Sequence, residues 1–253
     1  MPRYALTLEY DGTGFVGWQR QAVGVSVQQV LEAAASHLVG GAPVVSITAG
    51  RTDAGVHASG QVASLDLDRD IAGARLRDAL NFHMKPHAVA VLRAALAPDG
   101  WNPRFSAIGR AYRYRIINRA ARPALEAGRA WHVRDRLDVT AMGEAARLLL
   151  GLHDFTSFRA TACQAKSPVR TLDRLDVGRL GEEVLIEADA RSFLHHQVRN
   201  IVGTLKLVGE GAWPAARVAT ALAARDRAAA GPTAPAEGLM LVEVRYPDDL
   251  FSR

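Results

Sequence analysis

The side chains best suited to chemistry lie together in one glycine-punctuated stretch, residues 49–61. It carries a carboxylate at Asp53, a guanidinium at Arg51 and an imidazole at His57. A nearby cation keeps a carboxylate ionised, and an ionised carboxylate on a rigid loop can act as a nucleophile or a base. Asp-Ala-Gly is also good turn chemistry, because an aspartate accepts hydrogen bonds from backbone N–H groups two residues on. The spacing makes Asp53 a candidate catalytic residue and leaves the turn interpretation open.

Two β-branched runs flank this stretch, at residues 44–48 and 61–67. Their composition and alternation predict strands, so the stretch between them is expected to be a loop held at both ends by a sheet. A capping box at Ser26 opens a predicted helix after the first strand, residues 3–10. A second helix over 72–83 and a strand over 88–96 complete the order βαββαβ, the ferredoxin-like pattern.

The second half follows the same plan. Its predicted elements are a strand over 110–117, a helix over 138–150, strands over 169–177 and 183–190, helices near 198–205 and after Pro214, and a final strand over 239–244. We therefore expect an α+β fold of two ferredoxin-like (βαββαβ) modules with mainly antiparallel sheets side by side. Helices should cover one face, and a basic active-site cleft the other. The turn-rich sequence before Arg104 predicts modules of 1–103 and 104–253.

Composition indicates a globular chain with a full core, since 49% of its 253 residues are hydrophobic and 23% are charged. No apolar run approaches the roughly 18–20 residues that span a bilayer. The N-terminus passes directly into a strand pattern, which leaves no room for a signal peptide. Cys163 is the only cysteine, which excludes an intrachain disulfide. These features predict a cytoplasmic protein with no membrane partner.

Positive charge is concentrated in the middle of the chain. The formal net charge is +5, but between residues 104 and 136 nine arginines accompany only two acids. Aromatic side chains are interleaved with them, a combination that indicates a polyanion partner. The alternative is a solvated basic face that binds nothing specific. The nine are Arg104, Arg110, Arg113, Arg115, Arg119, Arg122, Arg129, Arg134 and Arg136.

The sequence Gly-Arg-Thr-Asp-Ala-Gly-Val-His at residues 50–57 resembles the signature of the TruA-type tRNA pseudouridine synthases, the tRNA pseudouridine synthase A family. Other segments resemble further motifs of that family in matching order. They are residues 10–13, 17–21 and 26–28 of the opening motif, then 104–107 with 113–114, 154–159, 193–203 and 236–239. The resemblance covers nearly the whole chain. Segments 81–87 and 101–103 depart from it, which affects local RNA contacts and not the chemistry.

The resemblance implies a cofactor-free and metal-free isomerase that converts uridine to pseudouridine at positions 38 to 40 in the anticodon arm of tRNA. It also implies a homodimer whose subunits share the tRNA. Asp53 would be the catalytic carboxylate, Arg199 would pair with it, and Tyr112 would stack on the displaced uracil. The substrate-binding residues implied are Tyr112, Arg51, Arg20, Gln19, His57, Arg104 and His195.

Two other functions start from the same residues. A non-catalytic tRNA-binding or RNA-remodelling module would use the basic surface without needing Asp53. A metal-dependent RNA hydrolase would use His57, His195 and His196. Adjacent histidines point in different directions, and no His-Glu-x-x-His or cysteine-pair spacing accompanies them, which disfavours a metal site.

Overall fold

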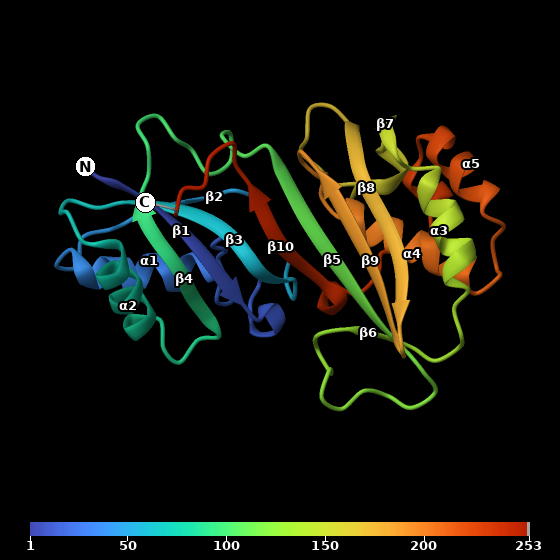
Figure 1. Ribbon diagram of the computed structural model, residues 1–253, viewed down its shortest axis with the longest axis horizontal. Coiled ribbons are helices and arrows are strands. Elements are labelled where there is room, and N and C mark those ends of the chain that lie inside the picture. Colours follow the sequence, from blue (N-terminus) through green and yellow to red (C-terminus); the bar gives the residue numbers. More distant parts are fainter. Residues whose placement is uncertain (252–253) are drawn as a thin grey trace. The chain divides into compact units, whose positions relative to one another are not determined.

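In the first hundred residues, segments with alternating apolar side chains form strands, and segments with apolar side chains at helical spacing form helices, as the sequence predicts. The computed structural model describes residues 1–251 and contains two compact units, the N-terminal unit (1–109 and the segment from Met240) and the C-terminal unit (110–239). The elements of the N-terminal unit are β1 (Arg3–Tyr10), η1 (Gly12–Gly14), α1 (Val27–Leu38), β2 (Ser46–Thr48), β3 (His57–Asp66), α2 (Gly73–His83), β4 (Val89–Leu96) and β10 (Leu239–Arg245) (Figure 1).

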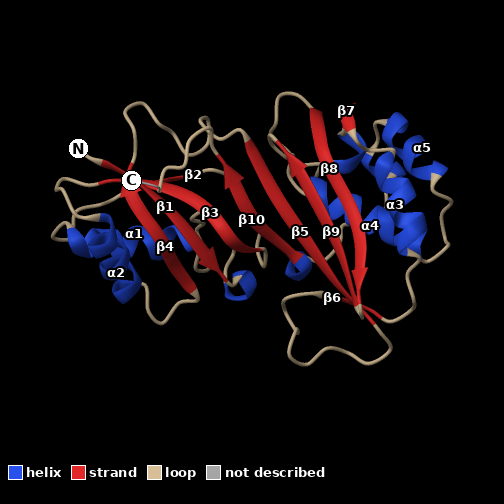
Figure 2. Ribbon diagram, viewed as in Figure 1, coloured by secondary structure: helices blue, strands red, loops and turns tan. Residues whose placement is uncertain are grey.

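The N-terminal sheet has the strand order β4-β1-β3-β10, with the short β2 paired to β3. β1 is antiparallel to both β3 and β4, whereas β10 runs parallel to β3. The helices α1 and α2 lie on one face of this sheet (Figure 2). Tyr4, Leu6 and Leu8 of β1 are completely buried, as are Leu31 of α1 and Leu76 of α2. This core holds the two strands that flank the Asp53 loop.

The C-terminal unit carries the second set of strands, in the order β5-β9-β8-β7 with β6 paired to β5. β9 runs antiparallel to β5 and to β8, and β7 runs antiparallel to β8, whereas the short β6 runs parallel to β5. The helices α3, α4 and α5 lie on one face of the sheet (Figure 2). Its elements are β5 (Gly109–Asn118), β6 (Trp131–Val133), α3 (Val139–Arg147), β7 (Gly151–Asp154), η2 (Thr156–Phe158), β8 (Val169–Leu180), β9 (Glu183–Ala190), α4 (Gln197–Gly209), α5 (Ala216–Ala224), η3 (Arg227–Ala229) and η4 (Ala236–Gly238).

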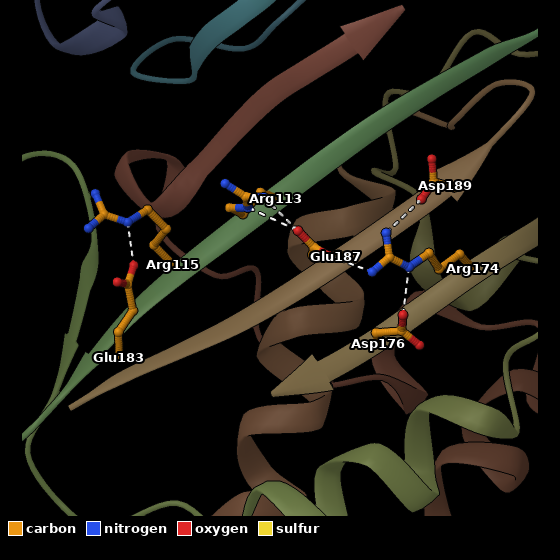
Figure 3. Close-up of polar contacts among 7 residues, drawn as sticks. All are labelled: Arg113, Arg115, Arg174, Asp176, Glu183, Glu187 and Asp189. Atoms are coloured by element: carbon orange, nitrogen blue, oxygen red, sulfur yellow. Dashed lines mark hydrogen bonds and ion pairs between the residues drawn. The ribbon is translucent and has the colours of Figure 1, made fainter. Parts of the chain in front are cut away.

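The two faces of β5 differ in chemistry because successive side chains point to opposite sides of a strand. Tyr114 and Ile116 are completely buried, toward the helices. Arg113 and Arg115 alternate with them and lie on the opposite, helix-free face (Figure 3). The same alternation in β9 buries Val184 and Ile186.

The predicted fold class is confirmed: the fold is α+β with mainly antiparallel sheets. The first half follows the βαββαβ order, and the second half follows it with β6, β7 and α5 added. Two short strands, β6 and β7, were not predicted. The modules 1–103 and 104–253 stay a prediction; the compact units divide the chain differently because β10 pairs with β3, Met240 opposite His57 and Leu241 opposite Ala58. Among the described residues, no helix has the length and apolar character needed to cross a membrane.

Candidate active site

The Asp53 loop, residues 49–56, connects the end of β2 to the start of β3. It is shorter than the predicted stretch 49–61, because β3 already begins at His57, where His57 pairs with Met240 of β10 and Ala58 with Tyr10 of β1. Asp53 is half-buried, while Arg51 beside it is exposed. Ala49 N–H donates to Val62 O at 2.8 Å, and Val56 N–H donates to Asp53 O at 3.1 Å. The loop is therefore closed by a backbone turn at Asp53, and the catalytic role of Asp53 stays a prediction.

The opening motif packs directly against the backbone of the Asp53 loop. Trp18 N–H donates to Thr52 O at 3.0 Å. Gly17 has φ +106°, and a Cβ placed on it would lie 2.7 Å from Thr52 O and 3.1 Å from the carbonyl carbon of Asp53. A Cβ on Gly12 would lie 2.2 Å from Val56 O. Glycine is required at both positions because only bare backbone fits against the loop.

A buried hydrogen-bond network supports the loop from beneath. The Tyr10 hydroxyl is bonded to Thr52 Oγ1 at 2.8 Å and accepts from Gln61 Nε2 at 3.2 Å. Gln61 Nε2 also donates to Gly50 O at 2.8 Å. Burial raises the pKa of Tyr10 to about 12, although its hydrogen bonds to Thr52 and Gln61 act in the opposite direction. Tyr10 is therefore a neutral, structural hydroxyl.

No role was predicted for Tyr10 or Gln61, although Tyr10 lies in the opening motif and Gln61 at the end of the stretch 49–61. The sequence contains a clue at Gln61. This amide occupies an inward position of a predicted strand whose other inward side chains are apolar. A buried amide must find partners, because an unsatisfied polar group in the interior costs about 1–3 kcal/mol. Here its partners are the Tyr10 hydroxyl and the Gly50 carbonyl of the Asp53 loop.

His57 is almost completely buried at the start of β3. Its Nδ1 accepts a hydrogen bond from Gly12 N–H at 3.0 Å, and Asp11 Oδ1 lies 3.3 Å away. The hydrogen bond from Gly12 N–H holds the imidazole ring in one orientation beside Asp11. His57 thus joins the Asp11 turn to the strand that follows the Asp53 loop, and its predicted role in substrate binding stays a prediction.

Gln19 and Arg20 follow the buried Trp18 and are both exposed. Arg20 Nη2 lies 3.0 Å from Glu32 Oε2, with about half of the arginine side chain exposed. Glu32 is itself fixed, because Oε1 accepts from Ser46 N–H at 2.8 Å and from Gln28 Nε2 at 2.9 Å. The pairing orients Arg20 at the surface beside the segment that contacts the Asp53 loop.

Tyr112 and Tyr114 share one face of β5 but differ in accessibility. Tyr114 is completely buried, its hydroxyl donates to Pro235 O at 2.8 Å, and burial raises its pKa. Tyr112 is only half-buried, and its ring meets Phe193 edge-on at a centroid distance of 5.2 Å. The structure thus brings Tyr112 to the segment that contains His195, and Tyr112 is the more accessible aromatic of the two.

The segment from Phe193 leads into α4 through a strained residue. His196, the residue before the helix, has φ +62°, in the left-handed region that is unusual for a residue other than glycine. His195, which precedes it, is exposed, and its carbonyl accepts from Ala160 N–H at 2.8 Å. On the first turn of α4, Arg199 Nε donates to Ala234 O at 2.8 Å, and Ala234 N–H returns a bond to Arg199 O at 3.1 Å. This reciprocal pair fixes the plane of the Arg199 guanidinium.

Arg104 lies in the turn that leads toward β5. Asn102 Oδ1 accepts from Arg104 N–H at 2.9 Å, which orders the backbone, and the guanidinium lies over the Phe105 ring at 5.7 Å. Both side chains are exposed. The Arg104 guanidinium is therefore exposed at the surface, where it is accessible to a ligand.

The basic stretch of residues 104–136 is less uniformly charged than its sequence indicates. Arg113 pairs with Glu187 at 2.7 Å, Arg119 with Glu182 at 2.7 Å, and Arg115 with Glu126 and Glu183. Figure 3 shows the pairs Arg113–Glu187 and Arg115–Glu183 on the helix-free face of the sheet, where Glu187 also contacts Arg174. The hydrogen bond from Arg113 holds the pKa of Glu187 below its usual range. Acids distant in sequence therefore neutralise part of the predicted excess of positive charge.

Comparison with known proteins agrees with the motif order. A family model described as tRNA pseudouridine synthase matches residues 7–106 and 145–247. A tRNA pseudouridine synthase A of Acidiphilium cryptum is 70% identical over 100% of both chains. A protein of the same name from Rhodospirillum centenum is 63% identical over 97% of this chain and 100% of its own. Another from Gluconobacter oxydans is 57% identical over 99% of this chain and 92% of its own. The chain belongs to the tRNA pseudouridine synthase family.

Proposed function

We propose that this protein isomerises uridine to pseudouridine at positions 38 to 40 in the anticodon arm of tRNA, with Asp53 as the catalytic carboxylate and without a cofactor. The chain is an isomerase of the tRNA pseudouridine synthase family, and its relatives are named for tRNA pseudouridylation. One observation carries the assignment of Asp53: a half-exposed carboxylate stands on a loop whose backbone is held by β2, by β3 and by the Gly17–Trp18 segment.

The chemistry is compatible with protein groups alone. Breaking the C1′–N1 bond of uridine and joining C1′ to C5 rearranges one molecule. C5 loses its proton in the reaction, and N1 gains one. No electrons enter or leave, so the isomerisation requires no redox carrier. Asp53 would act either as a nucleophile toward the nucleoside or as a base toward the sugar, and a carboxylate is suited to both.

The target base must leave its stack before it can react, at a cost of a few kcal/mol. Tyr112 is proposed to stack on the displaced uracil, which is worth about 1–3 kcal/mol. Its half-exposed ring is supported edge-on by Phe193, which fixes the ring plane. Arg199, whose guanidinium plane is fixed by Ala234 O, is proposed to pair with Asp53 and keep it ionised.

The remaining predicted site residues are proposed to bind the tRNA. Phosphate contacts position a nucleic acid, and exposed arginines suit them because the guanidinium binds phosphate with two parallel hydrogen bonds. Arg51, Arg20 and Arg104 are exposed, as are Gln19 and His195. His57 is buried, so its contribution would be indirect, through the Asp11 turn. We also propose that the protein is a cytoplasmic homodimer, on the strength of the family resemblance.

Tritium release from tRNA labelled at uridine C5 tests the role of Asp53. We expect Asp53→Asn to lower the rate by at least about 100-fold, since removing a positioned acid–base group typically costs 10²–10⁴. Asp68→Asn is a matched control, because Asp68 is an exposed acid two residues beyond the C-terminal end of β3, paired with Arg69 at 3.6 Å. Equal release from wild type and Asp53→Asn would refute the assignment. Transcripts with cytidine at 38, 39 or 40 in turn would show which positions are modified.

A further inference from the structure

Two residues other than glycine have a left-handed backbone in the part of the chain that the structure describes: His196 with φ +62° and Arg225 with φ +52°. This conformation is crowded for any residue that carries a Cβ, so each position stores strain. Arg225 has an ordinary explanation. It ends α5, where a left-handed residue is a common way to terminate a helix, and its N–H donates to Leu222 O at 3.4 Å.

The position of His196 has no such explanation. It precedes α4, and a residue there stabilises a helix when its backbone is extended and its side chain accepts from the first turn. The backbone of His196 is left-handed instead, and within the described part of the chain its imidazole makes no capping hydrogen bond. Glycine would fit the backbone better, and serine or aspartate would cap the helix better. Helix stability therefore does not account for a histidine at this position.

The next residue, Gln197, holds this backbone in place at a further local cost. Its side-chain Oε1 accepts from Leu194 N–H at 2.9 Å, and its own N–H donates to Leu194 O at 3.0 Å. Its Nε2 is buried and has no hydrogen-bond partner among the described residues, which is unfavourable for an amide. Two adjacent unfavourable features that surrounding contacts hold in place are typical of a functional turn.

The left-handed turn brings two imidazoles together. Adjacent side chains diverge in helices and strands, and the sequence predicted the same for His195 and His196. That expectation is wrong here, because the backbone at His196 is neither helical nor extended, and the two ring centroids lie 4.1 Å apart. His195 is exposed and His196 is half-buried. Each neutral imidazole carries one N–H donor and one acceptor nitrogen, so the pair presents both kinds of group.

This pair follows closely on the aromatic ring that supports Tyr112. Phe193, whose ring meets Tyr112 edge-on, precedes His195 by two residues, a separation of at most about 7 Å along the chain. Enzymes that react with a displaced base stack it on an aromatic side chain and read its edge by hydrogen bonds. Uracil presents two carbonyl oxygens and N3–H on that edge, which match imidazole donors and acceptors. A phosphate would use only the donors.

We propose that the imidazole of His196, together with that of His195, hydrogen-bonds the O4 and N3–H edge of the displaced uracil. The strained backbone of His196 is retained because it places the second ring for this contact. This inference rests on the proposed function and adds His196 to it as a specificity-determining residue.

Glycine at each left-handed position separates strain from function. We expect His196→Gly and Arg225→Gly each to raise Tm by roughly 2–4 °C, because glycine adopts this conformation without strain. His196→Gly should lower kcat/KM for pseudouridine formation about 10-fold or more, since it removes a polar contact to the base. Arg225→Gly should match wild type in activity. His196→Asn should recover part of the rate, because asparagine tolerates the left-handed conformation and keeps a polar side chain.

A modified substrate gives a readout that a purely structural role of His196 would not move. A tRNA whose target uridine carries an N3-methyl group cannot donate from N3, and chromatography of the digested nucleosides measures its conversion. We expect methylation to slow wild type about 10-fold or more and His196→Gly less than about 3-fold, because the variant has already lost the contact. A transition-metal chelator, added with Mg²⁺ present, should leave the wild-type rate unchanged.

The outcomes separate this inference from the function on which it rests. Wild type that forms no pseudouridine would refute both. Wild type that forms it while folded His196→Gly keeps the same kcat/KM would refute this inference alone, as would an N3-methyl effect of equal size in both proteins. A lower Tm for His196→Gly would assign the ring to the fold, and loss of wild-type activity in the chelator would assign the pair to a metal. Either result would overturn the proposal.

Discussion

Replacing Gly17 by alanine tests whether the opening motif positions Asp53. Gly17 has φ +106°, and a new Cβ would lie 2.7 Å from Thr52 O and 3.1 Å from Ala54 N. Both contacts are with backbone, which cannot rotate away as a side chain can. The left-handed conformation and the contacts together should cost about 2–4 kcal/mol. In a chain of this length that loss lowers Tm by roughly 5–15 °C.

The same substitution should lower activity beyond its effect on stability. The clash is relieved only if the Thr52 carbonyl moves by several tenths of an ångström, and Asp53 is the next residue along the chain. A displacement of about 1 Å at a reacting group can cost about 100-fold in rate, so we expect kcat to fall about 10-fold or more. Single-turnover tritium release, measured well below the lowered Tm, reports this change directly.

Gly14→Ala is the matched control, because a Cβ there would meet nothing within 4 Å. It should leave both Tm and the rate close to wild type. If Gly17→Ala behaves like Gly14→Ala in both measurements, the reasoning about this contact is refuted. A lower Tm with an unchanged rate would mean that Gly17 supports the fold but does not position Asp53.

Three further substitutions test other parts of the site. Tyr10→Phe removes the hydroxyl bonded to Thr52 and should lower the free energy of unfolding by about 1–2 kcal/mol in chemical denaturation at pH 7. Burial raises the pKa of Tyr10 to about 12, so the stability of the wild type should also fall as pH rises from 10 toward 12. The variant should lack this fall, because it has no hydroxyl to ionise. Glu187→Gln should destabilise the protein at pH 7, and because Arg113 lowers the pKa of Glu187 below its ordinary 4.5, the difference from wild type should shrink as pH falls below that value. Arg199→Lys keeps the charge but loses the fixed guanidinium plane, so kcat should fall about 10-fold with little change in Tm; an unchanged kcat would contradict the role of Arg199.

The two halves of the chain contribute different kinds of group to the proposed chemistry. The N-terminal unit supplies Asp53 on a loop that is restrained by backbone contacts and by a buried tyrosine–glutamine pair. The C-terminal unit supplies Tyr112 on a strand and Arg199 on the first turn of a helix. Strands and helices hold side chains more precisely than free loops do, and the loop that carries Asp53 gains comparable rigidity from the contacts around it.

The order of helices and strands was predictable because it depends on patterns that repeat within a few residues. The alternation in β1 and the N-cap at Ser26 are observed as predicted. The β-branched runs predicted the two strands around the Asp53 loop, but β3 begins four residues earlier than its run. The short β6 and β7 escaped prediction, since three or four residues carry too little periodicity to be recognised. The motif order also predicted the family correctly, because each motif is a local string of residues.

By itself, the sequence determined which residues are available for catalysis, the elements that carry them and the family to which the chain belongs. Only the tertiary structure decided that Gly17 supports the Asp53 loop, that Tyr114 is buried while Tyr112 is accessible, and that Glu187 neutralises Arg113. Arg113 and Glu187 are 74 positions apart along the chain and meet through the pairing of β5 with β9. Such contacts depend on strand register and on which face of the sheet each side chain occupies, and no short stretch of sequence contains that information.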